Sequence, residues 1–254
     1  MLGEWLGAAF TEFKANWQEH MIPSLIVFGV SFVGSFVMMG ILGAFVAVLV
    51  IGGSMLGEDF AAAGAILGYG IGLPLFIVGM IAIFTPVMVG YNRVVLRVMR
   101  GQSYEISEMF ALDGVVSAVV ANVVAGVVVS AAAMACYFPA IPVGALFLFT
   151  TPLIADRKVS GGLDAVKQSV ALARKNFWGL MGYWLVAVLI GMAVAYIPII
   201  GAFLSMPLLT TFILTAYLKL SGEDVGEQPM KALEGSSELV EKDLANPYAS
   251  PREV

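Results

Sequence analysis

The chain has 254 residues, of which 60% are hydrophobic and 12% charged, and its mean hydropathy is +0.93. This composition excludes a sizeable soluble catalytic domain, because little polar sequence is left outside the apolar runs. The net charge of −5 arises mainly after Ser221, so the acidity does not indicate a nucleic-acid partner. Cys136 is the single cysteine, which excludes an intrachain disulfide and a metal site built from several cysteines.

Four runs of the sequence contain no Asp, Glu, Lys, Arg or His: 21–57, 60–92, 114–155 and 176–218. A membrane-spanning helix needs roughly 20 apolar residues, so each run can cross a bilayer once and the last two can cross twice. An ionised side chain at the bilayer centre costs about 2.5–3.5 kcal/mol, so runs of this length are typical of lipid-embedded segments. The sequence therefore predicts an all-α, polytopic integral membrane protein.

The first predicted element is an amphipathic helix over residues 1–20. Its apolar residues share one helical face and are Leu2, Trp5, Leu6, Phe10, Phe13 and Trp17. Aromatic side chains suit the headgroup region, so we expect this helix, with His20 at its end, to lie at the membrane interface. Packing on the protein is the alternative. The segment lacks the basic start of a cleavable signal peptide, and none is expected.

The next two predicted elements are membrane spans over 22–52 and 62–91, and both are longer than a bilayer requires. Strong tilt, a break at Gly52-Gly53 or extension past the membrane could each absorb the excess length. Gly64, Gly68 and Gly72 stand four residues apart on one helix face. Such small-residue stripes let helices approach closely, so we expect an internal packing seam, with a homodimer face as the alternative.

The last two runs predict four further spans, over 115–137, 141–156, 177–197 and 201–220. All Lys and Arg residues fall outside the loops at 58–59, 138–142 and 197–201, and cytoplasmic loops concentrate these bases. This distribution predicts six spans arranged as three hairpins, with both termini in the cytoplasm. The domain organisation is then an interfacial helix (1–20), a six-span domain (21–220) and an acidic, partly disordered cytoplasmic tail (221–254).

The bases next to the membrane are the best functional indication in the sequence. Those singled out as candidate contacts for anionic lipid or an acidic partner are Arg93, Arg97, Arg100, Arg157, Lys158, Arg174 and Lys175. The first three stand at i, i+4 and i+7 and so share a helix face. Juxtamembrane bases attract anionic lipid, although the topology rule alone also predicts their presence. Asp156 and Asp164 are expected to pair with neighbouring bases.

No catalytic constellation, metal site or cofactor motif is recognisable, so an enzyme is not expected. Asn122 is the strongest polar residue within a predicted span and lies in a small-residue stripe with Ala118, Gly126 and Ser130. With Ser130, Thr85, Thr150 and Thr151, it is the candidate polar lining of a path for an uncharged solute. Hydrogen bonding between helices is the alternative use of these side chains.

Two stretches carry a resemblance to known proteins. The first comprises Gly90 to Arg97, Arg100-Gly101-Gln102 and Ser107 to Phe110; the second comprises Pro152 to Arg157, Asp164 to Ser169 and Asn176-Phe177-Trp178. Together they resemble uncharacterised bacterial six-span families related to the membrane domain of glycerophosphodiester phosphodiesterases. The resemblance implies a six-helix fold with amphipathic cytoplasmic helices in the bacterial inner membrane. It implies no activity, because the phosphodiesterase chemistry of those proteins belongs to a separate soluble domain.

These observations favour a non-enzymatic accessory or scaffold protein that binds lipid or a larger membrane complex through its cytoplasmic face. The alternative is a passive pore or carrier for a small neutral solute, which requires a cavity beside Asn122. A membrane enzyme of lipid metabolism ranks third, because the sequence offers no nucleophile or metal ligands for it.

Overall fold

The computed structural model describes residues 2–135, 137–197 and 200–223, and every regular element within them is a helix. In chain order these are α1 (Leu2–Ala15), α2 (Trp17–Ser54), α3 (Glu58–Met99), the short 3-10 helix η1 (Ile106–Phe110), α4 (Val115–Ala135), α5 (Tyr137–Leu146), α6 (Thr150–Ala155), α7 (Gly162–Arg174), α8 (Phe177–Ala195) and α9 (Ile200–Ser221). The all-α prediction is confirmed for this part of the chain. Cys136 and all of the predicted tail from residue 224 onwards lie outside the described residues.

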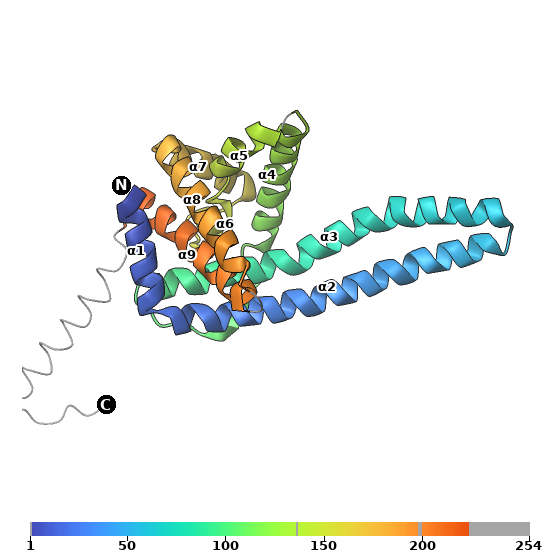
Figure 1. The fold of residues 1–254 in the computed structure, drawn as a ribbon, viewed down its shortest axis with the longest axis horizontal. Coiled ribbons are helices and arrows are strands. Elements are labelled where there is room, and N and C mark those ends of the chain that lie inside the picture. Colours follow the sequence, from blue (N-terminus) through green and yellow to red (C-terminus); the bar gives the residue numbers. More distant parts are fainter. Residues whose placement is uncertain (1, 136, 198–199, 224–254) are drawn as a thin grey trace, which may run out of the picture.

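Helices α2 and α3 form a long antiparallel hairpin that projects far beyond the other helices (Figure 1). The two helices pack closely through glycine. A Cβ atom at Gly64 would overlap the carbonyl oxygen of Leu49, and one at Gly68 would lie 3.2 Å from Cα of Val46. The glycine stripe of α3 is therefore a seam within the chain, occupied by α2, as the sequence pattern favoured.

The hairpin is longer than a bilayer core. Helix α2 has 38 residues and runs through Gly52 and Gly53 to Ser54, so the break considered at these glycines is absent. Helix α3 has 42 residues and contains Pro74 and Pro86. At 1.5 Å per residue the two helices are about 57 and 63 Å long, against a hydrocarbon core of about 30 Å.

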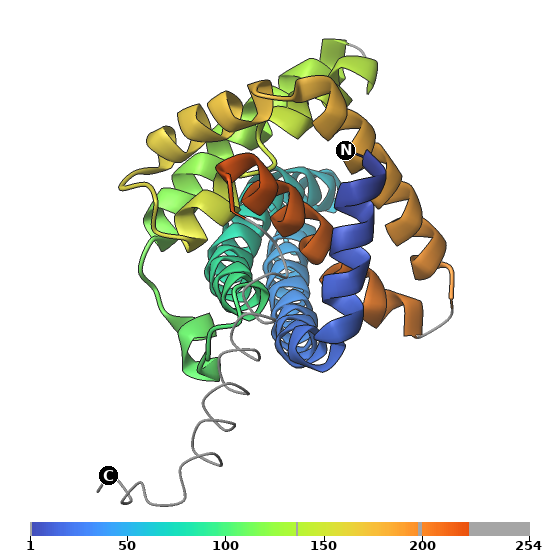
Figure 2. The same cartoon turned by 90° about the vertical axis from the view of Figure 1, so that its left-hand side faces the viewer.

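The other helices form a collar around the base of the hairpin, where α2 begins and α3 ends (Figure 2). Figures 1 and 2 both show α4 and α8 running across the hairpin direction rather than parallel to it. Within the described residues, five helices are long and apolar enough to cross a membrane: α2, α3, α4, α8 and α9. Large apolar side chains on the projecting part of the hairpin are exposed, among them Phe36, Met39 and Ile66 at 65%, 65% and 74%. An apolar surface of this kind is suited to contact with lipid.

The span predicted over 141–156 is not one continuous helix. A turn at 147–149 separates α5 from α6, and neither helix alone is long enough to cross a bilayer. Ser169 of α7, which is fully buried, satisfies the backbone groups freed at the break. Its hydroxyl donates to the carbonyl of Leu146 (2.8 Å) and accepts from the backbone N–H of Phe149 (3.1 Å). Non-helical backbone is tolerated at membrane depth when protein groups supply such partners.

Replacing Ser169 by alanine is expected to lower the free energy of unfolding by roughly 2 kcal/mol, because a buried N–H and a buried C=O lose their partner. Unfolding in mixed detergent micelles, followed by circular dichroism, measures the difference. Ser107→Ala is the matched control, since Ser107 is exposed and its hydroxyl contacts only Glu105. Equal stability of the two variants would show that water or another group satisfies the break.

Helix α1 packs along α8 and α9, which fits the alternative of packing on the protein, while its position at the membrane interface stays a prediction. The Trp5 ring meets Tyr183 edge-on at 5.5 Å, and Phe10 meets Phe212 at 5.2 Å. His20, expected at the interface, is instead fully buried at the corner between α1 and α2, where it stacks on Phe13. Helix α2 takes a new direction after residue 16, and His20 lies on the inner side of the corner that α1 and α2 form.

Candidate functional site

The three arginines predicted to share one helix face lie at the end of α3. Arg93 and Arg97 are in its last two turns, and Arg100 directly follows its last residue, Met99. The opposite face of this part of α3 carries Tyr91 and Val95, which are fully buried in the apolar core. Arg93, Arg97 and Arg100 consequently share one side, as their spacing predicted.

Together with Arg157, these residues line a cavity of about 180 Å³, which we call the arginine cavity. Its complete lining is Arg93, Leu96, Arg97, Arg100, Gln102, Ala155, Asp156 and Arg157. Arg157 lies in the turn after α6 and has a φ of 55°, a conformation that non-glycine residues seldom adopt. Four guanidinium groups and one carboxylate therefore face this space.

Two acids in the segment between α3 and α4 compensate three of the four arginines. Asp113 lies 3.2 Å from Arg93 and also pairs with Arg157, while Glu108 of η1 lies 2.7 Å from Arg97. Burial alone would raise the pKa of the Asp113 carboxyl, but hydrogen bonding to Arg157 and the charge of Arg93 hold this pKa below its ordinary value. Sequence reasoning missed both acids as partners, because only the packing of η1 against α3 brings them to the arginines.

The fourth arginine belongs to a partly buried network centred on Asp156. Arg100 forms a bidentate pair with Asp156, with Nη2 at 2.9 Å from Oδ2, and its Nε lies 2.9 Å from Glu223. Lys158 bridges the two acids, 2.9 Å from Asp156 and 2.6 Å from Glu223. The Tyr217 hydroxyl donates to Asp156 Oδ2 at 2.8 Å. The network therefore connects the end of α3 and the end of α6 to α9 and to Glu223. It confirms the predicted pairing of Asp156 with neighbouring bases.

Burial on its own would raise the pKa of Asp156, but hydrogen bonds from Arg100, Lys158 and Tyr217 outweigh it and leave the pKa below its ordinary value. The pKa of Glu223 is lowered in the same way, with burial opposed by Arg100 and Lys158.

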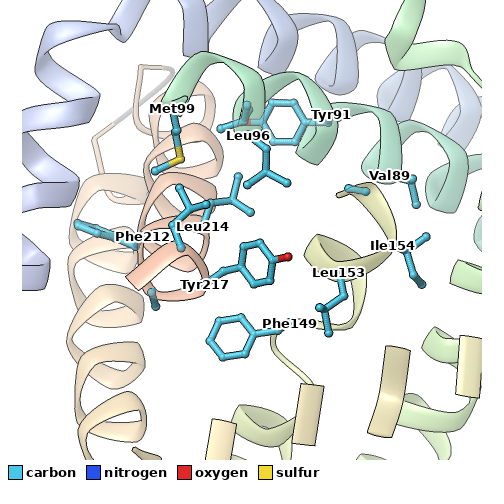
Figure 3. Close-up of a cluster of buried hydrophobic side chains, with 14 of the residues drawn as sticks. Val89, Tyr91, Leu96, Met99, Phe149, Leu153, Ile154, Phe212, Leu214 and Tyr217 are labelled. Atoms are coloured by element: carbon cyan, nitrogen blue, oxygen red, sulfur yellow. The ribbon is translucent and has the colours of Figure 1, made fainter. Parts of the chain in front are cut away.

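The network rests on the main apolar core. Figure 3 shows Tyr217 of α9 beside Phe149 and facing Leu153 of α6, and the Tyr217 and Phe149 rings lie 6.0 Å apart.

The seven candidate bases are thus separated into three sets. Four line the arginine cavity, and Lys158 lies beside it in the Asp156 network. Arg174 and Lys175 are exposed at the end of α7, where Lys175 donates to the Leu220 carbonyl at 3.4 Å, and they do not line the cavity.

A second cavity, of about 290 Å³, lies beside Asn122, and we call it the polar cavity. Its lining is Phe84, Thr85, Met88, Asn92, Asn122, Leu148, Thr151, Pro152, Thr210 and Ile213. Three of the five predicted polar residues are therefore brought together: Asn122 from α4, Thr85 from α3 and Thr151 from α6. Thr150 instead donates to the carbonyl of Phe147, and Ser130 is exposed elsewhere on α4.

Two further polar residues of this cavity were missed. Asn92 closes a charge-free run immediately before Arg93, and Thr210 lies three residues after the proline of α9. Their positions, at the end of a charge-free run and shortly after a proline, were the available indications. Among the described residues, no group of three His, Cys, Asp or Glu side chains gathers as a metal ion would require.

Comparison with family models, curated proteins and solved structures gives no match to this chain. The resemblance to the six-span families accordingly stays a prediction, and the two cavities carry the functional argument.

Proposed function

We propose that this chain is a non-enzymatic integral membrane accessory or scaffold protein that holds an anionic lipid headgroup in the arginine cavity. The observation that carries the proposal is the convergence of four guanidinium groups on one cavity whose lining contains a single acid, Asp156. Through this face the protein would bind membrane lipid or the acidic surface of a larger complex.

Guanidinium groups suit this role because their planar donors match phosphate oxygens in pairs. The neighbouring acids do not remove the preference for an anion, because Glu108 and Asp113 are not among the lining residues. They pair with Arg97 and Arg93 and offset part of the attraction of these two bases for an anion. Anionic lipid is also concentrated at the cytoplasmic leaflet, where each nearby base adds about 1 kcal/mol of attraction.

We further propose that the chain makes six crossings of the bacterial inner membrane, with both termini in the cytoplasm. Helices α5 and α6 together would make the fourth crossing, broken at residues 147–149. A hairpin whose apolar run is about 50–55 Å long fits a core of about 30 Å if it tilts by roughly 53–57° from the membrane normal. Such a tilt would let α4 and α8, which run across the hairpin, cross the same bilayer at an angle of their own.

The double variant Arg97→Gln/Arg157→Gln is expected to retain at least fivefold less phosphatidylglycerol than the unchanged protein, because half of the guanidinium groups of the cavity are removed. The protein is purified in nanodiscs of equal phosphatidylglycerol and phosphatidylethanolamine, and native mass spectrometry counts the retained lipids and any bound protein partner.

The matched control is Arg174→Gln/Lys175→Gln, which removes the same charge from the exposed end of α7. Retention should be unchanged there. Equal loss in both variants would indicate unspecific attraction to the basic surface, and no loss in either would overturn the proposal. Melting temperatures of both variants separate loss of binding from loss of fold.

A passive pore or carrier for a small neutral solute is the second candidate function. The polar cavity beside Asn122 favours it, because a pore or carrier of this kind requires space at that position. Solute flux into proteoliposomes tests this candidate independently of lipid retention.

A further inference from the structure

We propose that the polar cavity is a binding site for a small uncharged polyol. The proposal deepens the carrier candidate by naming a ligand class, but it concerns binding and does not require transport. It is also independent of the arginine cavity.

The first step is that polar side chains face the cavity without partners. Within the part of the chain that the structure describes, Thr85, Asn122 and Thr151 make no hydrogen bond. They come from three different helices, and Thr85 is only 5% exposed. A hydroxyl or amide left without a partner in an apolar environment costs about 1–3 kcal/mol, so these groups favour a molecule that completes their hydrogen bonds.

The second step is that the helices do not satisfy one another here. Polar residues in spans usually form hydrogen bonds between helices, which was the alternative for Asn122. The structure instead leaves a space of about 290 Å³ between Asn122, Thr85 and Thr151. This volume is well above the roughly 10–15 Å³ that a single water molecule needs.

The third step concerns the chemistry of the ligand. No charged side chain is among the lining residues, so an ion would lose its hydration without gaining a counter-charge. The threonine hydroxyls and the Asn122 amide both donate and accept, while Asn92 uses its amide N–H₂ on the Met88 carbonyl at 2.7 Å and presents a carbonyl oxygen. Hydroxyl groups, which also donate and accept, match this set.

The apolar part of the lining completes the match. Phe84, Leu148 and Ile213 offer surface for the carbon skeleton of a polyol. The arginine cavity, which suits anions, lies next to the polar cavity. It begins one residue further along α3, at Arg93, and one turn further along α6, at Ala155. The two cavities therefore divide uncharged from anionic ligands along the same pair of helices.

Cysteine accessibility in the full-length protein tests the site. In a Cys136→Ala background, Asn122→Cys and Thr151→Cys are labelled in liposomes with the small neutral reagent methyl methanethiosulfonate. Val127→Cys is the control. Val127 is on the outer surface of α4 with 64% exposure, so in liposomes its replacement would face lipid and not water. The probe is erythritol, compared with butan-1-ol and butyrate, which have the same number of carbon atoms.

The expected result is that both cavity cysteines react at least tenfold faster than the control, and that erythritol slows them at least threefold. Butan-1-ol and butyrate should have no such effect, and adding Thr85→Val should reduce the protection by erythritol. Slow labelling at both cavity positions would overturn the cavity itself. Fast labelling that erythritol does not slow, or that all three compounds slow equally, would overturn the polyol site while leaving lipid retention at the arginine cavity untouched.

Discussion

The variant Asp156→Asn is expected to lose roughly 3 kcal/mol of unfolding free energy, because it leaves the charge of Arg100 without its bidentate partner. Breaking a buried ion pair by neutralising one member typically costs about 3–5 kcal/mol, and the side chain of Asp156 is only 8% exposed. Glu223 and the remaining amide hydrogen bonds offset part of the loss. Unfolding in mixed micelles at pH 7 measures the difference from the unchanged protein.

The pH dependence gives this prediction a second readout. The pKa values of Asp156 and Glu223 are lowered in the folded state, so their stabilisation is complete above the ordinary carboxyl pKa of about 4. It is lost progressively as the pH falls from there through the folded-state values. The gap between the unchanged protein and Asp156→Asn should therefore narrow below about pH 4.

Asp164→Asn is the matched control, because Asp164 is exposed in the first turn of α7 and outside the network. It should behave like the unchanged protein at every pH. A loss of equal size in both variants would mean that net charge, and not the Asp156 network, controls stability.

Much of the fold follows from the sequence because lipid imposes simple rules. The charge-free runs locate α2, α3, α4, α8 and α9, since backbone groups in a membrane must be satisfied within a helix. The spacing of Gly64, Gly68 and Gly72 identifies the seam of the hairpin, because only glycine lets the backbone of α2 approach so closely.

The break between α5 and α6 could not be predicted in this way. It depends on Ser169, which is 20 residues from Phe149 and reaches the free backbone groups only after α7 has packed on α6. The burial of His20 could not be predicted either, because it depends on the angle at which α2 follows α1 and not on helical periodicity.

The candidate sites were predictable in part. Helical spacing placed Arg93, Arg97 and Arg100 on one face, and polarity within an apolar run singled out Asn122. The charge balance was not predictable, because Glu108 and Asp113 come from an irregular segment with no periodic pattern. A base next to a predicted span therefore indicates an attraction for anions. The strength of this attraction depends on which acids the fold brings to the base.

Replacing Gly90 by alanine is expected to detach η1 from α3 and to lower the free energy of unfolding by roughly 2–3 kcal/mol. A Cβ atom at Gly90 would overlap the carbonyl of Met109 and lie 2.6 Å from its Cα, so the contact is with backbone that cannot rotate away. Detachment would withdraw Glu108 from Arg97 and Asp113 from Arg93. Limited proteolysis with a glutamyl endopeptidase should then cut the segment around Glu105 and Glu108 at least tenfold faster.

Gly70→Ala provides the control on the same helix, since Gly70 is exposed and a Cβ atom there would meet nothing within 4 Å. It should leave both stability and the cleavage rate unchanged. Because the arginines lose their acids in Gly90→Ala, this variant should also retain more phosphatidylglycerol than the unchanged protein, although it is less stable. The contrary outcome is a variant that is destabilised and cleaved faster but retains less lipid. It would show that Glu108 and Asp113 position the arginines for binding, and that these two acids favour the anion site.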